Sequence, residues 1–204
     1  MSWPPEVELA GRHARLTPLR ADHETALAEA VKDGALWNLW FTHIAAPEDM
    51  AADIQRRLAL RAAGSSLPFA VIDQASGEPV GMTAYLNVDP VNLRLEIGST
   101  WYRRAAQRTA INSECKRMLL AHAFESLNCI AVEFRTHYFN RESRRAIGRL
   151  GAKFDGVLRS HMKMRDGSLR DTCVYSITAA EWPAARAGLD ARLERGATPF
   201  PTPP

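Results

Sequence analysis

Apolar and polar residues alternate along LRLEIGST at 93–100, as they do in a β-strand with one buried face. Leu95 and Ile97 fall on one side of such a strand, and Glu96 falls on the other. Two short turn sequences, QASGE at 74–78 and DG at 166–167, predict antiparallel hairpins. Six further segments, rich in apolar, β-branched or aromatic residues, are predicted as strands: 7–16, 68–73, 79–88, 129–136, 153–164 and 170–178.

Helical spacing of apolar residues marks five other segments: 19–33, 47–63, 109–127, 140–152 and 181–193. Pro47 suits the first turn of the second helix, and Gly64 suits its end. The third helix carries apolar residues on two nearly opposite faces, one through Ile111 and the other through Phe124. A helix of this kind packs against neighbours on two sides.

The predicted order of elements is β, α, α, β, β, β, α, β, α, β, β, α. Strand 93–100, helix 109–127 and strand 129–136 form a βαβ unit, and a helical crossover makes its two strands parallel. The neighbouring hairpins are antiparallel, so the predicted fold class is α/β, a mixed seven-stranded sheet with helices on both faces. The length of 204 residues predicts one domain over 1–195, and the proline-rich end at 196–204 is expected to be a disordered tail.

Composition narrows the class of protein. Hydrophobic residues make up 46% and charged residues 24%, as in a soluble domain, and a net charge of +3 does not indicate a nucleic-acid binder. Cys115, Cys129 and Cys173 lack the spacing of a metal site and are expected to be buried free thiols. The first residues show no signal-peptide pattern and no apolar run is long enough to span a membrane, so a cytoplasmic location is expected.

The basic stretch WYRRAAQRTAIN at 101–112 joins a predicted strand to the long helix. A strand that runs through a short turn into a helix places main-chain amides where they can bind phosphate. Such turns are usually rich in glycine, whereas this one contains none. The stretch is therefore either a phosphate-binding loop or an arginine-rich bend exposed to solvent.

Four pieces follow one another along the chain: the hairpin PFAVID–QASGE–PVGMT, the strand LEIGSTW, the helix NSECKRMLLAHAFE, and TxxxNxxSxxAIxxLGA from Thr136 onward. In this order, over roughly 7–180, they resemble the Gcn5-related N-acetyltransferase superfamily, and more closely its branch that includes ribosomal-protein N-terminal acetyltransferases. The pyrophosphate loop of that family reads Q/R-x-x-G-x-G/A. Here Ala105 takes the opening position, Arg108 the first glycine position and Ala110 the second.

The resemblance implies that acetyl-CoA lies where the two parallel strands separate. Its pantetheine arm is expected to pair with the backbone near 100–102, and its diphosphate is expected on the main chain at the start of the helix. If residues 107–112 already belong to the first helical turn, their φ is negative and Ala110 fits. No metal and no covalent intermediate are implied. The expected coenzyme contacts are Thr100, Trp101, Tyr102, Gln107, Arg108, Thr109, Ala110, Ile111, Asn112, Asn140 and Ser143.

Glu96 is the candidate general base, because a carboxylate in a covered strand needs a partner or a purpose and burial raises its pKa toward neutrality. Two alternatives remain: a structural ion pair of Glu96 with Arg94 or another arginine, and Glu133 as the base. Under the resemblance, Ser143 donates a proton to the departing sulfur. The structural alternative makes Asn140 a helix N-cap and Ser143 an ordinary first-turn residue.

Aromatic residues mark the irregular segment 34–46, which borders the acceptor entrance under the resemblance. Trp37, Trp40 and Phe41 either shape an acceptor groove or form a core cluster. The expected acceptor contacts are Trp37, Trp40 and Glu96.

Several basic residues carry open alternatives. Arg144 and Arg145 either meet the 3′-phosphate of the coenzyme or point into solvent. His122 lies on an apolar helix face and is expected to be a core histidine with a satisfied hydrogen bond. His137 and His161 have no evident partner in the sequence.

The leading hypothesis is an N-acetyltransferase that uses acetyl-CoA and a primary amine, with a protein N-terminus favoured as the acceptor and a small-molecule amine next. A second hypothesis is a domain that binds acyl-CoA or peptide without turnover. The least favoured is a nucleic-acid-binding module that uses the arginines of 141–149, 159, 165 and 170. No membrane partner and no nucleic acid are expected, and the sequence leaves homo-oligomerisation open.

Overall fold

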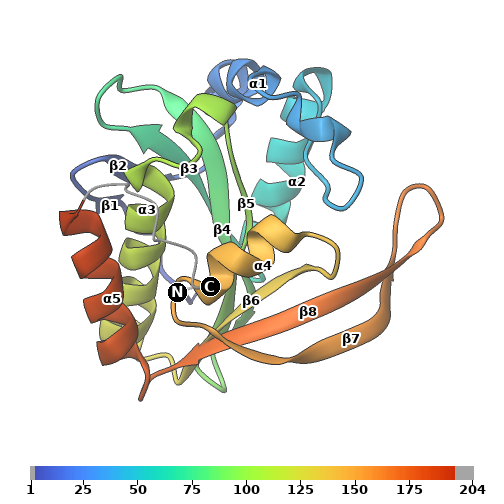
Figure 1. Cartoon of the computed structure of the whole chain (residues 1–204). Coiled ribbons are helices and arrows are strands. Elements are labelled where there is room, and N and C mark those ends of the chain that lie inside the picture. The colour runs from blue at the N-terminus through green and yellow to red at the C-terminus, as the bar shows by residue number, and fades with distance from the viewer. Residues whose placement is uncertain (1–2, 196–204) are drawn as a thin grey trace.

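Eight strands form one sheet in the computed structural model, which describes residues 3–195 (Figure 1). The order across the sheet is β1-β2-β3-β4-β5-β6-β8-β7. All neighbours are antiparallel except β5 and β6, so the predicted mixed sheet is confirmed. The strands are Leu9–Ala10 (β1), Ala14–Pro18 (β2), Leu67–Asp73 (β3), Pro79–Asp89 (β4), Arg94–Tyr102 (β5), Ala131–His137 (β6), Lys153–Lys163 (β7) and Leu169–Thr178 (β8).

Helices cover both faces of this sheet, as the sequence predicts (Figure 1). Phe69 and Val71 of β3 pack toward α3 and α5, whereas Ala70 and Ile72 pack toward α1 and α2. The alternation along one strand therefore produces two cores, one on each side of the sheet. The α-helices are Glu24–Lys32 (α1), Met50–Ala62 (α2), Ala110–Ala121 (α3), Arg141–Gly148 (α4) and Trp182–Glu194 (α5), and a π-helical turn, His122–Ser126, extends α3.

The predicted strand at 7–16 is wrong as a single strand, because it forms the short hairpin of β1 and β2. The carboxylate of Glu114 in α3 accepts hydrogen bonds from the main-chain amides of Arg12, His13 and Ala14, at 2.8, 2.7 and 2.7 Å. A Cβ on Gly11 would lie 2.4 Å from the carboxyl carbon of Glu114, so a larger residue here would push this carboxylate away from the three amides. This split changes the predicted count of seven strands to eight.

The parallel pair of β5 and β6 is short. Its register pairs Arg94 with Ala131, Leu95 with Val132 and Glu96 with Glu133. Beyond Glu96 the two strands are no longer paired, although β5 continues to Tyr102. The predicted βαβ unit is thus confirmed, and it opens a gap between two parallel strands in the middle of the sheet.

Several smaller expectations concern the whole chain. The three cysteines are buried and free, as predicted. None of the helices within residues 3–195 is long and apolar enough to cross a membrane. The expected tail at 196–204 lies outside the described residues.

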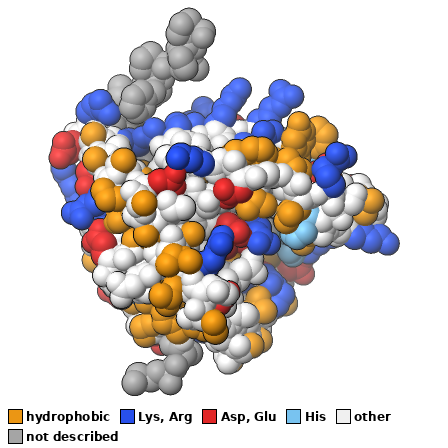
Figure 2. Space-filling model, turned by 90° about the horizontal axis from the view of Figure 1, so that it is seen from below, with side chains coloured by type: hydrophobic (Ala, Val, Ile, Leu, Met, Phe, Trp, Pro, Cys, Tyr) orange, Lys and Arg blue, Asp and Glu red, His pale blue; other side chains and the backbone are white. Residues whose placement is uncertain are grey.

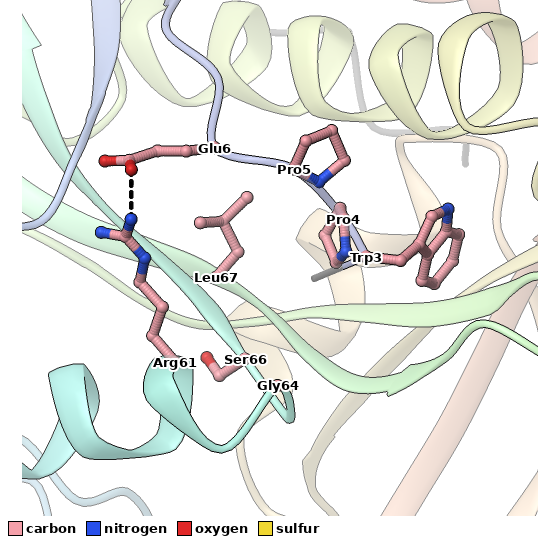
Figure 3. A pocket seen from close by; sticks show the side chains of 8 residues that line it. All are labelled: Trp3, Pro4, Pro5, Glu6, Arg61, Gly64, Ser66 and Leu67. Atoms are coloured by element: carbon pink, nitrogen blue, oxygen red, sulfur yellow. Dashed lines mark hydrogen bonds and ion pairs between the residues drawn. The ribbon is translucent and has the colours of Figure 1, made fainter. Parts of the chain in front are cut away.

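A hollow of about 230 Å³ lies between the N-terminal segment and the α2–β3 connection (Figure 3). The ion pair of Glu6 and Arg61 borders it.

Candidate active site

The loop between β5 and α3 is anchored at its first half by Asp33, which directly follows α1. The main-chain amide of Ala105 donates to the Asp33 carboxylate at 2.9 Å, and the amide of Arg104 donates to the Asp33 carbonyl at 3.0 Å. The Ala105 amide, together with the Arg103 guanidinium, holds the pKa of the Asp33 carboxyl below its usual range. The arginine-rich bend is therefore a fixed loop that joins two elements.

The second half of the loop leaves main-chain amides available. The amides of Arg108 and Thr109 make no hydrogen bond with any residue between 3 and 195. The following amides open α3, where the first turn of a helix lacks intrahelical acceptors. Thr109 caps α3, since its Oγ1 accepts from the Ile111 amide at 3.3 Å and donates to the Ala106 carbonyl at 2.8 Å. Free amides and a helix N-terminus together favour an anion here.

The condition that residues 107–112 belong to the first helical turn is not met at Arg108, because α3 begins at Ala110 and the φ of Arg108 is +61°. This left-handed backbone is the conformation for which glycine is preferred at the same position of the family loop. The turn therefore keeps a glycine-like shape without a glycine. The Arg108 side chain is 92% exposed and lies 3.8 Å from the Glu142 carboxylate, so it does not fill the mouth of α3.

Other predicted coenzyme contacts lie at the end of β5 and in the loop. Trp101 is buried on the α1 and α2 side of the sheet, and Tyr102 is buried on the α3 side, so they can offer only main chain at this edge. The Gln107 side-chain amide donates to the Tyr102 carbonyl at 2.9 Å. Ala105, Ala106, Thr109, Ala110 and Ile111 border an open hollow of about 380 Å³.

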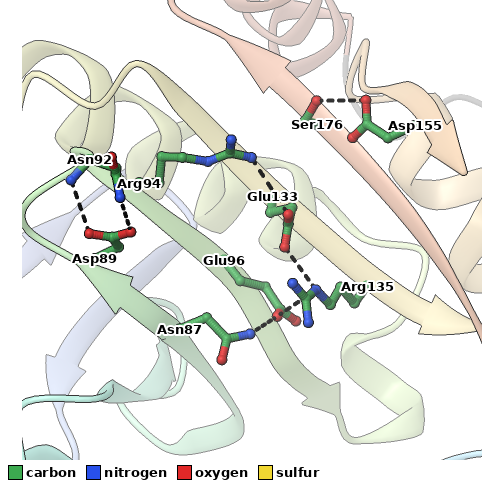
Figure 4. Close-up of polar contacts among 9 residues, drawn as sticks. All are labelled: Asn87, Asp89, Asn92, Arg94, Glu96, Glu133, Arg135, Asp155 and Ser176. Atoms are coloured by element: carbon green, nitrogen blue, oxygen red, sulfur yellow. Dashed lines mark hydrogen bonds and ion pairs between the residues drawn. The ribbon is translucent and has the colours of Figure 1, made fainter. Parts of the chain in front are cut away.

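Glu96 is the last residue of β5 that pairs with β6, and its side chain is only 5% exposed. The side-chain amide of Asn87 donates to its Oε2 at 2.7 Å, and Arg135 Nε lies 3.6 Å from the same oxygen (Figure 4). Burial raises the pKa of Glu96 to about 7, against the opposing influence of Arg135 and Asn87. A Cβ on Gly98 would lie 2.6 Å from Glu96 Oε1, so this glycine makes room for the carboxylate.

Glu133, the alternative base, is neutralised by two arginines. Arg135 Nε lies 2.8 Å from one of its oxygens and Arg94 lies 3.6 Å from the other (Figure 4). The structural alternative for Glu96 is therefore met by another arginine, Arg135, whereas Arg94 pairs with Glu133. The pairing with two arginines leaves Glu133 less suited than Glu96 to accept a proton.

A stability measurement can test the burial of Glu96. Because the folded-state pKa is raised, the folded protein binds this proton more tightly than the unfolded chain does. The stability that this proton adds to the folded state is complete below the unfolded pKa near 4.5, and it is lost as pH rises through about 7. Glutamine carries no charge at either pH, so Glu96→Gln should gain stability relative to wild type as pH rises. We expect the unfolding free energy of the variant minus that of wild type to be about 1–3 kcal/mol larger at pH 8 than at pH 5.

Urea unfolding at the two pH values provides the measurement, with Glu133→Gln as the matched control for loss of a neighbouring carboxylate. An equal effect of Glu96→Gln at both pH values would show that Glu96 titrates normally.

Asn140 and Ser143 begin α4, and the structural alternative for Asn140 is confirmed. Asn140 Oδ1 accepts from the Ser143 amide at 3.0 Å, which makes Asn140 the N-cap. Arg144 does not point into solvent: its Nε donates to the Tyr175 hydroxyl at 3.1 Å, and its guanidinium lies over the Tyr138 ring at 4.8 Å. Arg145 is exposed.

The aromatic residues of 34–46 divide between the two predicted roles. Trp37 packs on the core between the sheet and the helices α1 and α2. Trp40 is 58% exposed, and its ring lies 5.2 Å from His137 and 5.9 Å from Phe139 between centroids. Trp40 therefore joins the segment after α1 to the end of β6 and forms an exposed aromatic surface.

The histidines have partners that the sequence does not reveal. His122 is a buried core histidine as predicted, with its Nδ1 3.1 Å from the Tyr85 hydroxyl, and burial lowers its pKa. His137 Nδ1 accepts from the Phe139 amide at 3.1 Å, and His161 Nδ1 lies 3.1 Å from Thr172 Oγ1. The partners of His137 and His161 come from turn and strand geometry, which is why none was evident in the sequence.

Sequence reasoning missed Lys116, a buried lysine in α3. Its Nζ donates to Thr100 Oγ1 at 2.7 Å and to Thr83 Oγ1 at 3.2 Å, and burial lowers its pKa to about 8. It holds Thr100 at the point where β5 bulges and Ser99 has a φ of +50°. The triplet KRM resembles a solvated helix face, so no local signal reveals this contact.

The chain matches the family described as "Acetyltransferase (GNAT) domain" over residues 13–153. It belongs to this family, and it is therefore an acetyl-CoA-dependent acetyltransferase. The family-level resemblance inferred from the sequence is confirmed.

Two curated relatives are similar to the chain. The uncharacterized N-acetyltransferase p20 of Bacillus licheniformis is 28% identical over 142 residues, which are 70% of this chain and 77% of that protein. YdaF of Bacillus subtilis strain 168, named as a candidate ribosomal N-acetyltransferase, is 30% identical over 106 residues, which are 52% of this chain and 57% of that protein.

Solved structures share the fold. A GCN5-related N-acetyltransferase from Brucella melitensis has a TM-score of 0.83 and 31% identity, covering 93% of this chain and 86% of that chain. RimJ of Mycobacterium smegmatis, solved in complex with CoA-disulfide, has a TM-score of 0.77 at 22% identity, covering 95% and 97% of the two chains. The second likeness concerns the fold alone.

Proposed function

We propose that this acetyltransferase transfers the acetyl group of acetyl-CoA to the α-amine of a polypeptide chain, with a small-molecule amine as the next candidate. The observation that carries the proposal is the pairing of two features on β5. Unpartnered amides lie at the loop that follows β5, and a buried carboxylate with a pKa of about 7 lies where β5 separates from β6.

The chain offers a continuous place for the coenzyme. The amides of Arg108 and Thr109 and the N-terminus of α3 would bind the diphosphate, since they carry unsatisfied donors and the positive end of the helix dipole. The pantetheine arm would lie along β5 beyond Glu96, where the edge toward β6 has no strand partner. Acetyl-CoA supplies the activated acyl group, and the thioester would lie near the point of separation.

Glu96 would act as the general base. The amine nitrogen forms the new bond to the acetyl carbon, its proton passes to Glu96 directly or through water, and the carbon–sulfur bond breaks to release the thiolate. Glu96 can take up this proton near neutral pH because its pKa is about 7. Ser143, whose main-chain amide donates a hydrogen bond to Asn140 Oδ1 at the start of α4, would donate its hydroxyl proton to the sulfur and take up a proton from solvent.

The acceptor class is supported by two observations. The curated relative YdaF is named as a candidate ribosomal N-acetyltransferase. The exposed aromatic surface of Trp40 and Phe139 offers contact area for more than a small amine. The test is a thiol-release assay with a library of peptides, followed by mass spectrometry of their N-termini. Acetyl-CoA binding without thiol release for any amine would instead indicate a non-catalytic domain.

Arg108 is expected to contribute its main-chain amide and not its guanidinium, because the side chain is 92% exposed. Glycine at this position keeps the amide and accepts the positive φ without strain. We therefore expect Arg108→Gly to leave the acetyl-CoA Kd within about threefold of wild type, with a similar salt dependence. Isothermal titration at 50 and 200 mM salt measures both, and a tenfold weaker Kd with a flatter salt slope would show that the guanidinium binds phosphate.

A further inference from the structure

On one face of the sheet, the core beneath α1 and α2 includes no residue of β6 or β8. Leu95, Phe134 and Cys173 lie in the core beneath α3, so the residues that alternate with them point to the opposite face. By this alternation Glu96 and Arg135 face the same side. Arg170 belongs to that side too, because its Nε donates to Thr172 Oγ1, two residues along β8, at 3.0 Å.

Arg170 is a partly buried cation that makes no close ion pair with any residue between 3 and 195, and the carboxylate whose charge acts on it is that of Glu96. Arg135 pairs with Glu133 and Glu96, and Arg159 on the same hairpin pairs with Asp171. Arg170 makes no such ion pair, and only its bond to Thr172 is present. Burial lowers the pKa of Arg170, which reflects the cost of removing its guanidinium from water. A partly buried guanidinium with no close ion pair can bind an anion through charge-assisted hydrogen bonds.

The surroundings place Arg170 beside the acceptor entrance. Arg170 binds Thr172, and Thr172 pairs with His137 across β8 and β6, so the guanidinium is attached next to the aromatic surface. Its charge also acts on Glu96 and on His137. The ring of His137 contacts those of Trp40 and Phe139, with centroids 5.2 and 5.7 Å away.

The hairpin that carries Arg170 also meets the segment after α1. At the hairpin tip, Arg165 Nη2 lies 2.9 Å from His43 Nε2. Figure 2 shows the protein from below, with basic side chains along the rim and on the projection at the right.

We propose that Arg170 binds a carboxylate of the acceptor close to the reacting amine, so that this enzyme selects amines that carry an acidic group. The inference rests on the proposed function and deepens it by naming the acceptor chemistry. The carboxylate can belong to a free amino acid or to an acidic side chain at a peptide N-terminus. In either case it would give Arg170 the close ion pair that no residue between 3 and 195 supplies, whereas a neutral acceptor would not.

The test uses two matched pairs of acceptors that differ by one charge. Comparing glycine with glycinamide tests a free α-carboxylate. Comparing Asp-Ala amide with Asn-Ala amide tests a side-chain carboxylate at a peptide N-terminus. In at least one of the two pairs, we expect the wild-type kcat/KM for the acceptor with the carboxylate to exceed that for its neutral partner at least tenfold. The pair that shows this preference identifies the source of the carboxylate, a free amino acid or an acidic peptide N-terminus. Arg170→Met should reduce this ratio to about one, whereas Lys163→Met, which removes an exposed cation from β7, should keep it.

A binding arm keeps the test independent of turnover. The N-acetylated forms of the four compounds are titrated by calorimetry into the full-length protein saturated with CoA. Tighter binding of one carboxylate, lost in Arg170→Met, supports the proposal even if no thiol is released, in which case the proposed function alone fails. Equal affinity for both members of each pair, no binding of either carboxylate, or a preference unchanged in Arg170→Met overturns the role of Arg170.

Discussion

Replacing Glu96 with glutamine is expected to lower kcat/KM for the amine acceptor by about 10²–10⁴-fold, the range typical for loss of a general base. The substitution keeps the size of the side chain and an oxygen for the Asn87 hydrogen bond. It removes the group that accepts the proton. Acetyl-CoA affinity should remain close to that of wild type, since Glu96 lies at the separation of the strands and not at the loop that starts α3.

The pH profile separates this role from a structural one. In wild type, kcat/KM should rise with pH as Glu96 ionises near pH 7 and as the α-amine of the acceptor becomes neutral near pH 8. Glu96→Gln should lose the dependence near pH 7 and keep the one near pH 8. Glu133→Gln serves as control and should reduce the rate less than about tenfold, because two arginines already neutralise Glu133. A Glu96→Gln enzyme with nearly wild-type rates would exclude Glu96 as the base.

Introducing a carboxylate at the start of α3 should abolish tight coenzyme binding. Ala110 is the first residue of α3 and borders the hollow next to the loop. A glutamate there stabilises the helix through its dipole, so Ala110→Glu should fold at least as well as wild type. Its charge would repel the diphosphate, and we expect the acetyl-CoA Kd to increase about 30-fold or more at low salt.

Ala110→Gln is the control for the added volume. It should weaken binding much less than Ala110→Glu, and high salt should reduce the difference between the two variants. Equal effects of glutamate and glutamine would show crowding in place of charge repulsion. Unchanged affinity in both variants would place the diphosphate away from α3.

The order of elements could be predicted because most of it follows from local patterns. The alternation in β5 and the two-faced pattern of α3 were enough for the parallel pair and the crossover. The division of 7–16 into β1 and β2 could not be predicted, since it depends on the Glu114 carboxylate about 100 residues away in sequence. A long-range side-chain contact that terminates a strand leaves no trace in the periodicity of that strand.

The candidate phosphate loop shows the same limit at one residue. From the sequence the loop could belong to the first helical turn with negative φ, whereas the structure has +61° at Arg108. A side chain with a Cβ disfavours this backbone, so propensity argues against it. The surrounding anchors decide instead, through Asp33 before the turn and the Thr109 cap after it.

The candidate site was predicted in part. Glu96 was recognised because a charge in an apolar strand is conspicuous, and its raised pKa agrees with that interpretation. Asn87, Arg135 and Arg170 were not assigned to it, since strand register and sheet order bring them to Glu96. Each looks like an ordinary polar residue of a strand until the pairing of β5, β6 and β8 is known.

A crystal structure of the protein with acetyl-CoA tests the central claim most directly. The account predicts diphosphate oxygens within about 3.2 Å of the amides of Arg108, Thr109 and the first turn of α3, with the thioester next to Glu96 between β5 and β6. A coenzyme bound elsewhere, or those amides turned toward other protein groups in the complex, would contradict it.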